Sequence, residues 1–182
     1  MRGCNLSEMT NMATPSLIEL LEPRIAPATF VNAFVVTYTD VDGDLVKVKS
    51  SKPIFHDDLR EFTFTPGSEG EELSELLLKP SASGADLKVK VIETGTSGDG
   101  AVNVRLIHAT GVDLRSVSIE GALERISVGD YDRAVRGIGL LHVASLGRPE
   151  GEPDEIYLFS GAGIVLIDGD LVGSMVTPGD ID

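Results

Sequence analysis

The chain of 182 residues is poor in cysteine, in aromatic side chains and in long apolar segments. Cys4 is the only cysteine, so an intrachain disulfide is excluded and oxidation has no part in holding the fold together. No segment approaches the ~20 consecutive apolar residues needed to span a bilayer, and the first residues lack the ~7–15-residue apolar core of a signal peptide. We therefore expect no membrane span. Cys4 follows Gly3, but no apolar stretch precedes it as a lipoprotein cleavage box would require.

Basic residues are outnumbered, because Lys and Arg total 15 against 29 Asp and Glu, which gives a formal net charge of −14. The acidic residues are scattered along the chain rather than gathered in one run. Such a surface repels the phosphates of nucleic acids and of anionic membranes, since no cluster of Lys or Arg can neutralise them. Nucleic-acid binding is therefore excluded as an expected function.

Helix signals are also scarce, whereas 20 glycines and 9 prolines indicate many short strands and turns. With 42% hydrophobic residues the chain can bury a sizeable core, so we predict an all-β fold with minor α content. The one substantial helix that the sequence predicts covers residues 68–80. There Leu73, Leu76 and Leu77 share a helical face and Pro80 ends the segment.

Residues 34–49, FVVTYTDVDGDLVKVK, carry the clearest local signal. Two β-rich runs flank Asp42 and Gly43, a dipeptide that tolerates the positive φ angles of a type I′ turn. Beyond this turn, apolar residues are set among Lys47 and Lys49. We predict a β-hairpin with one apolar and one charged face.

The carboxyl-terminal part of the chain falls into register when it is stacked every 24 residues. The aligned sets are Val117, Leu141 and Val165, then Ile119, Val143 and Ile167, and then Gly121, Ser145 and Gly169. A fixed period of this length is typical of supersecondary units that cover one another's apolar faces. We predict a β-solenoid with 24-residue coils. An antiparallel β-sandwich is the alternative, because apolar strands recur in any β protein.

These signals divide the chain into three parts. Residues 1–28 are predicted to form a flexible amino-terminal arm, residues 29–110 a β-rich capping module with one short helix, and residues 111–182 the solenoid coils. Within the coils, residues 147–155 (GRPEGEPDE) are predicted to form an exposed loop, because they combine two prolines with four acidic residues. The last coil stops at Asp182 without a polar capping segment. We therefore expect a truncated piece of a longer protein, or pairing with a partner at that end.

The segment LLEPRIAPA at residues 20–28 resembles the short amino-terminal motif of the LEPR-XLL family, found at the start of many large secreted or surface proteins of certain aquatic bacteria. The chain keeps residues 21–24 (LEPR) and departs at residues 25–27 (IAP), where the name-giving form has two leucines. The phrases TYTDVDGDLVKVKSSK, VDLRSVSIEGALERISVGD and IDGDLVGS are similar to the first module and the repeated strand units of those proteins. The resemblance covers residues 20–50 and 111–182. It implies an extracytoplasmic location and β-helical repeats, and it implies no known catalytic residue.

Asp40, Asp42 and Asp44 place three carboxylates at alternate positions of the predicted turn. An EF-hand loop counted from Asp40 needs Gly at its sixth place and Glu at its twelfth, where the chain has Leu45 and Ser51. We interpret the group as a solvated hairpin turn with acidic flanks. A calcium-stabilised module that binds calcium weakly is the alternative.

Glu120 and Asp168 occupy equivalent places two coils apart. Coils stacked at roughly 4.8 Å would place these carboxylates about 10 Å apart, close to the ~6.5–9.5 Å that separates the two acids of an inverting glycosidase. The intervening position is Ala144, and no aromatic platform for a sugar is evident. We interpret both acids as solvating charges, with sugar cleavage as the alternative.

The other patterns of catalysis or ligand binding are missing from the sequence. His56, His108 and His142 lack the paired spacing of a zinc site, and no GxSxG motif occurs. Gly161 and Gly163 precede a continued strand, whereas a dinucleotide fingerprint needs a helix there. The sequence therefore assigns no catalytic, cofactor-binding or metal-binding residue and no cofactor.

Taken together, the sequence predicts a non-catalytic structural or adhesive module of a bacterial surface or secreted repeat protein, located outside the cytoplasm. The alternative is a polysaccharide-binding or polysaccharide-cleaving β-helix protein. The expected partners are other parts of a longer chain, or another protein, through the uncapped carboxyl-terminal edge. Surface polysaccharide is a further candidate partner.

Overall fold

The structure is a computed structural model. It describes residues 27–93, 98–130, 132, 134–147 and 155–176. Several predicted features lie outside these residues: most of the amino-terminal arm with its LEPR-like motif, Cys4, and most of the loop predicted at 147–155.

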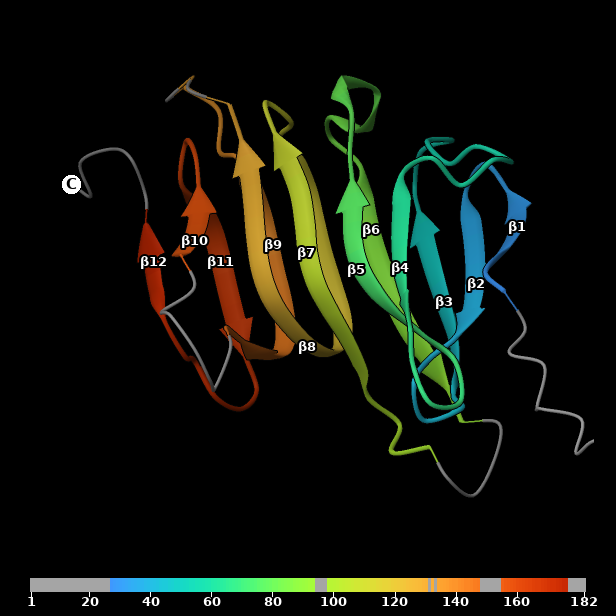
Figure 1. The fold of residues 1–182 in the computed structure, drawn as a ribbon. Helices are drawn as coiled ribbons and strands as arrows, with labels where there is room; N and C mark the ends of the chain where they lie inside the picture. Colours follow the sequence, from blue (N-terminus) through green and yellow to red (C-terminus); the bar gives the residue numbers. More distant parts are fainter. Residues whose placement is uncertain (1–26, 94–97, 131, 133, 148–154, 177–182) are drawn as a thin grey trace, which may run out of the picture.

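The described residues form twelve strands and one short 3-10 turn, Pro80–Ala82, and they contain no α-helix (Figure 1). The strands are β1 (Thr29–Asn32), β2 (Val35–Thr39), β3 (Leu45–Ser50), β4 (Phe62–Pro66), β5 (Glu71–Leu77), β6 (Asp86–Ile92), β7 (Val102–Thr110), β8 (Leu114–Gly129), β9 (Ile138–Leu146), β10 (Glu155–Leu158), β11 (Ala162–Ile167) and β12 (Ser174–Val176).

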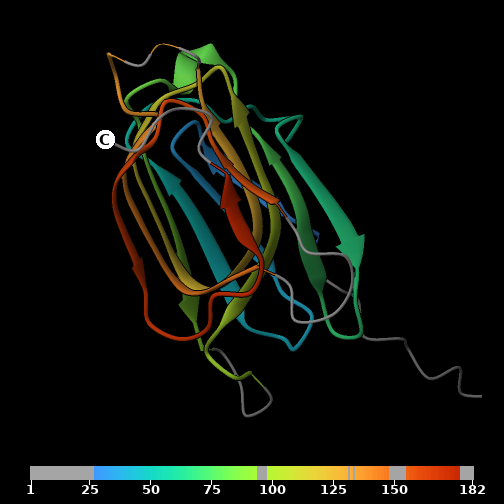
Figure 2. The same cartoon turned by 90° about the vertical axis from the view of Figure 1, so that its left-hand side faces the viewer.

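The twelve strands belong to one mixed sheet that curls into a half-barrel, as the two views in Figures 1 and 2 show. The amino-terminal pairs β1–β2, β2–β3, β3–β6 and β4–β5 are antiparallel. The pairs that β7 to β12 make are parallel. The all-β prediction is therefore confirmed as a curled mixed sheet. The β-solenoid stays a prediction, and so does its alternative, the antiparallel β-sandwich.

Strand β8 is the longest strand and pairs along both of its halves. Its first half lies between β6 and β9, and its second half pairs with β7 from Gly121 to Gly129. The change of partner falls at Gly121, where a Cβ atom would lie 2.0 Å from the carbonyl oxygen of Val102. Only glycine permits so close an approach of two backbones. Gly121 therefore allows β8 to pair with β6 along its first half and with β7 along its second half.

Strands β8, β9 and β11 lie side by side, and the residues aligned by the 24-residue period are direct partners. Val117 pairs with Leu141, and Leu141 pairs with Val165. The same relation holds for the second aligned set, Ile119, Val143 and Ile167. Side chains that share a position in parallel strands stack on the same face of the sheet. The residues aligned by the 24-residue period are therefore stacked in adjacent parallel strands.

The third aligned set is out of register in the structure. A bulge between Ile119 and Ala122 makes Ala122, and not Gly121, the partner of Ser145. The extra residue in β8 lies where the strand changes partners, and such bulges bend the strand that contains them. The period of the sequence therefore fails where the backbone turns.

The helix predicted over residues 68–80 is wrong, because this segment contains strand β5. In the antiparallel pairing of β5 with β4, the register shifts by one residue at Ser74, which forms a bulge. The bulge lets Leu73 and Leu76, three positions apart, both point into the core, where each is fully buried. A spacing of three between buried leucines is also what a helix shows. The predicted capping module, residues 29–110, therefore lacks its short helix.

The predicted hairpin is confirmed, because β2 and β3 pair antiparallel and their last pair is Thr39 with Leu45. Its loop comprises residues 40–44, and Gly43 has a φ of 98°. A type I′ turn would need a positive φ at Asp42 as well, and Asp42 does not have one. The loop is therefore longer than the two-residue turn that the dipeptide predicted.

Aromatic side chains fill the core beneath this hairpin. The ring centroids of Tyr38 and Phe64 are 5.0 Å apart, and those of Phe55 and Phe62 are 5.1 Å apart. Tilted pairs at this distance suit the charge distribution of the rings. They fix Tyr38, and with it the end of β2 that leads into the loop.

We expect Leu141→Ala to lower the free energy of unfolding by about 2–5 kcal/mol, because Leu141 is fully buried between Val117 and Val165 and its removal leaves a cavity. The matched control is Leu166→Ala, at a position that is 47% exposed, which should cost less than about 1 kcal/mol. Urea unfolding followed by circular dichroism measures both. Equal losses in the two variants would contradict the described packing.

Candidate functional site

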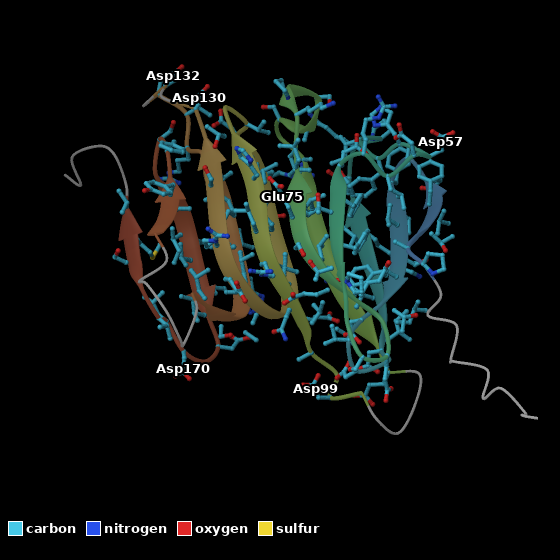
Figure 3. The ribbon with its side chains drawn as sticks, viewed as in Figure 1. Asp57, Glu75, Asp99, Asp130, Asp132 and Asp170 are labelled. Carbon is cyan, nitrogen blue, oxygen red and sulfur yellow. The ribbon has the colours of Figure 1, made fainter. Side chains whose placement is uncertain are left out.

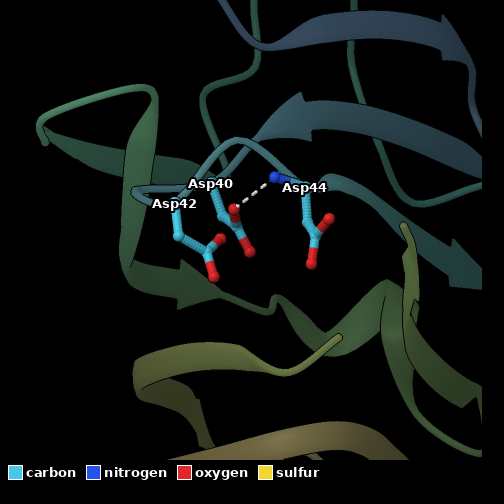
Figure 4. Close-up of side chains that lie close together, drawn as sticks. All are labelled: Asp40, Asp42 and Asp44. Atoms are coloured by element: carbon cyan, nitrogen blue, oxygen red, sulfur yellow. Dashed lines mark hydrogen bonds between the residues drawn. The ribbon is translucent and has the colours of Figure 1, made fainter. Parts of the chain in front are cut away.

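The loop between β2 and β3 brings three carboxylates together, as Figure 4 shows. Asp40, Asp42 and Asp44 each offer one oxygen, and these three atoms lie within 4.8 Å of one another. The Asp44 N–H donates to Asp40 Oδ1 at 2.8 Å, and the Asp40 N–H donates to the Asp44 carbonyl oxygen at 2.9 Å. These bonds hold the first and last acids of the loop side by side.

A segment of the connection between β6 and β7 lies against the same carboxylates. The Asp99 N–H donates to Asp42 Oδ2 at 3.0 Å, and the Gly100 N–H donates to Asp44 Oδ2 at 2.9 Å. Figure 3 shows Asp99 at the lower end of the sheet, where the β2–β3 loop also lies. Two connections that are distant in the sequence therefore meet at these carboxylates. We call the group of Asp40, Asp42 and Asp44 the acidic loop site.

The site is buried to a degree that is unusual for carboxylates. Asp40 is 4% exposed and Asp44 is fully buried. With the acids ionised, Asp42 Oδ1 and Asp44 Oδ1 are buried and have no hydrogen-bond partner, and the same is true of the Tyr38 hydroxyl. A buried polar atom without a partner carries its full desolvation cost. The backbone donors therefore satisfy only part of the site.

A cavity of about 160 Å³ opens beside the acidic loop site. Besides Asp40 and Asp42, its wall includes the oxygen-bearing side chains of Glu71, Glu72, Asp99 and Asn103. Of these, Glu72 lies 3.9 Å from a guanidinium nitrogen of Arg105. No ion pair to Asp40, Asp42 or Asp44 is found in the described part of the chain.

The crowding of carboxylates changes their affinity for protons. Burial, and then a hydrogen bond to the Asp42 carboxylate, raise the pKa of Asp40 to about 7. The same hydrogen bond lowers the pKa of Asp42. Burial, together with the charges of Asp40 and Glu72, raises the pKa of Tyr38 far above its ordinary value. Asp40 and Asp42 thus behave as a pair that shares one proton.

The sequence identified the three loop acids but not their surroundings. The interpretation as a solvated turn is wrong for Asp40 and Asp44, which are buried. The ligands of an EF-hand lie within one twelve-residue loop, which here would begin at Asp40. The structure instead places the segment of Asp99 and Gly100 against the loop, more than fifty positions along the chain. The glycines and aspartate of that segment are the only sequence signal that could have indicated it.

Glu120 and Asp168 line the same depression, of about 340 Å³. Glu120 Oε1 lies 3.2 Å from Lys90 Nζ, and Asp168 Oδ2 lies 3.0 Å from His142 Nε2. Both carboxylates are open to solvent, with side-chain exposures of 43% and 70%. Each therefore has its own partner, which is the arrangement of a solvated surface charge.

The three histidines form separate contacts. His56 Nδ1 lies 2.6 Å from Glu61 Oε1, and His108 Nδ1 lies 3.2 Å from Glu75 Oε1. His142 contacts Asp168, as described above. In the described ranges, the only group of three or more potential ligands is the acidic loop site, so no histidine joins a metal-binding group there.

The chain matches no protein-family model, and neither a curated protein nor a solved structure shows significant similarity to it. Within the described residues, no helix has the length and the apolar character needed to cross a membrane. The resemblance to the LEPR-XLL family stays a prediction.

In buffer that contains a chelator, we expect the free energy of unfolding to fall as the pH rises from about 4 to about 8. Folded Asp40 keeps its proton up to about pH 7, whereas the unfolded chain releases it near the ordinary value of 3.8. The folded state therefore binds more protons in this interval, and stability decreases with rising pH. Asp40→Asn should flatten this part of the curve. Denaturant unfolding at several pH values measures it, and identical slopes for the two proteins would contradict the described environment.

Proposed function

We propose that the chain is a non-catalytic structural module of a bacterial surface or secreted protein, organised as a β-solenoid from residue 111 onward. Its last described strands, β11 and β12, receive further β-structure. The extracytoplasmic location rests on the resemblance of residues 20–50 and 111–182 to surface proteins. The structural role rests on the apolar side chains of β11, which face the core but are only half-buried.

The observation that carries the proposal is an open end of the apolar core. Leu141 and Val143 in β9 are fully buried. Their partners in β11, Val165 and Ile167, face the same core but are only half-buried. Each strand of this series is covered by the next one up to β9, and β11 pairs only with β9 in the described structure. A further strand in the same register would bury Val165 and Ile167.

The surface at this end is apolar as well. Large apolar side chains are 37–57% exposed along β11 and β12 and between them, at Ile164, Leu166, Leu171 and Met175. Proteins normally protect edge strands with charged residues, proline or bulges. Strand β11, with the sequence AGIVLI, has none of these. Its edge therefore suits pairing with another strand, and in a solution of this chain the available partner is a second copy.

We expect the chain to associate with itself through this end, and Ile164→Lys and Leu166→Lys to shift it toward the monomer. A lysine on the face or edge of β11 would have to be desolvated for another strand to pair there. The measurement is size-exclusion chromatography with light scattering over a range of protein concentrations.

Val135→Lys is the matched control, because Val135 is 50% exposed but lies outside β11 and β12. It should leave the association unchanged. A wild-type chain that stays monomeric at every concentration would contradict the proposal. So would association that all three lysine variants affect equally.

The rival function, cleavage of a polysaccharide, is favoured by one observation, the depression that Glu120 and Asp168 share. We expect the protein to release no reducing sugar from neutral or acidic polysaccharides, because Glu120 is paired with Lys90, Asp168 contacts His142, and both acids are open to solvent. A reducing-sugar assay measures this. Release that both Glu120→Gln and Asp168→Asn abolish would overturn the non-catalytic proposal.

A further inference from the structure

We propose that the acidic loop site binds one divalent cation, and that Ca²⁺ is the cation it takes, through the carboxylates of Asp40, Asp42 and Asp44. The site lies at the β2–β3 end of the sheet and is independent of the open end at β11 and β12. It goes beyond the structural role proposed above, and neither proposal depends on the other.

The three carboxylates have the spacing that a shared ion requires. Their ligand oxygens lie within 4.8 Å of one another. Calcium binds oxygen at about 2.4 Å, so two oxygens on opposite sides of one ion are about 4.8 Å apart. A single ion can therefore contact all three acids with little movement of the loop.

The buried atoms without partners supply a second and independent reason. Asp44 is fully buried, and its Oδ1 has no hydrogen-bond partner although its Oδ2 accepts the Gly100 N–H. When both acids are ionised, Asp42 repeats this pattern, with Oδ2 bonded to the Asp99 N–H and a buried Oδ1 that has no hydrogen-bond partner. In each case the backbone fixes one oxygen of the carboxylate and leaves the other available. A cation would satisfy both remaining oxygens at once.

The backbone around the site leaves no space for side chains. At Gly98 a Cβ atom would lie 1.9 Å from Asp44 Oδ1. At Gly70, in the loop between β4 and β5, it would lie 1.8 Å from the carbonyl oxygen of Asp40. Glycine at these two positions lets two other loops close over the acids. Asp40 and Asp44 are therefore enclosed rather than exposed as the acids of an ordinary turn would be.

The donor set identifies the class of cation. All the potential ligands are oxygens, whereas zinc prefers nitrogen and sulfur. Magnesium demands a near-ideal octahedron and keeps most of its water, but calcium accepts six to eight oxygens in irregular arrangements. The neighbouring cavity, lined by Asp99 and Asn103, has room for water molecules or further oxygens to complete such a shell. These properties favour calcium.

A bound ion would also connect distant parts of the chain. The acids belong to the β2–β3 hairpin, and the N–H groups that orient them belong to the connection between β6 and β7. Neutralising the acids removes the repulsion that opposes this contact. The ion would therefore stabilise the folded state as a whole rather than the loop alone.

We expect the full chain, first treated with a chelator, to gain roughly 5–10 °C in Tm when CaCl₂ is added to about a hundred times its Kd. Isothermal titration calorimetry should give one site per chain. MgCl₂ at equal ionic strength should produce a smaller shift, which separates specific binding from general screening of the net charge of −14.

Asp44→Asn is the decisive variant. The amide has the shape of the carboxylate, and its oxygen can still accept the Gly100 N–H, so the fold should persist. Without calcium the variant should melt no lower than the wild type, because one buried negative charge is gone. Its affinity for calcium should fall at least about tenfold. Asp170→Asn, an exposed acid far along the sheet (Figure 3), is the control and should respond to calcium as the wild type does.

Terbium provides a second measurement that does not depend on melting. Tyr38 lies two residues before Asp40, so excitation of tyrosine should sensitise Tb³⁺ bound at the site, and calcium should displace the emission. Tyr38→Phe should remove most of this signal while calorimetric binding of calcium is retained, since the Tyr38 hydroxyl has no partner to lose. The proposal is overturned if melting curves are the same in chelator and in calcium. It is also overturned if Asp44→Asn and Asp170→Asn bind calcium equally well.

Discussion

The parallel pairing of β8 with strands on both sides is the interaction on which the rest of the structure depends. Its first half joins β6 to β9, and its second half joins β7 to β10. Buried backbone groups must be hydrogen-bonded, so this strand cannot be displaced without orphaning donors and acceptors in four neighbours. The side chains of Val117, Leu123 and Ile126 then fix which face is buried. Everything toward the amino terminus and everything toward the carboxyl terminus is attached to this one element.

The two ends of the sheet carry different unfavourable contributions to the free energy of folding. At the β2–β3 end, the aromatic core is complete around Tyr38, and the imbalance is electrostatic, since Asp40 and Asp44 are buried without a positive partner in the described residues. At the β11–β12 end the imbalance is apolar, since Val165 and Ile167 are only half-buried among the described residues. A cation would correct the first and another strand would correct the second. The acidic loop site and the apolar edge thus lie at opposite ends of the sheet.

The sequence predicted the features that depend on neighbours or on a fixed period. The hairpin and the pairing of Val117 with Leu141 belong to this group, because a turn dipeptide between β-rich runs indicates the first and the 24-residue period indicates the second. It failed where the backbone departs from regularity. The bulge at Ser74 gives two buried leucines a helical spacing, and the bulge beside Gly121 breaks the alignment with Ser145. The sequence indicated only the three acids of the acidic loop site, because the segment that bonds to them does so through backbone N–H groups and is marked in the sequence only by its glycines and aspartate.

The regular spacing of the parallel strands has a consequence for the order of folding. Strand β9 closes a loop of 24 residues to reach β8, and β11 closes a loop of the same length to reach β9. The entropic cost of each closure is therefore similar, and each new strand meets a surface that the previous one has completed. The connection from β6 to β7 must also close against the acidic loop, where the charges of the buried carboxylates oppose it. Calcium, by removing that opposition, would favour this closure whenever it occurs during folding.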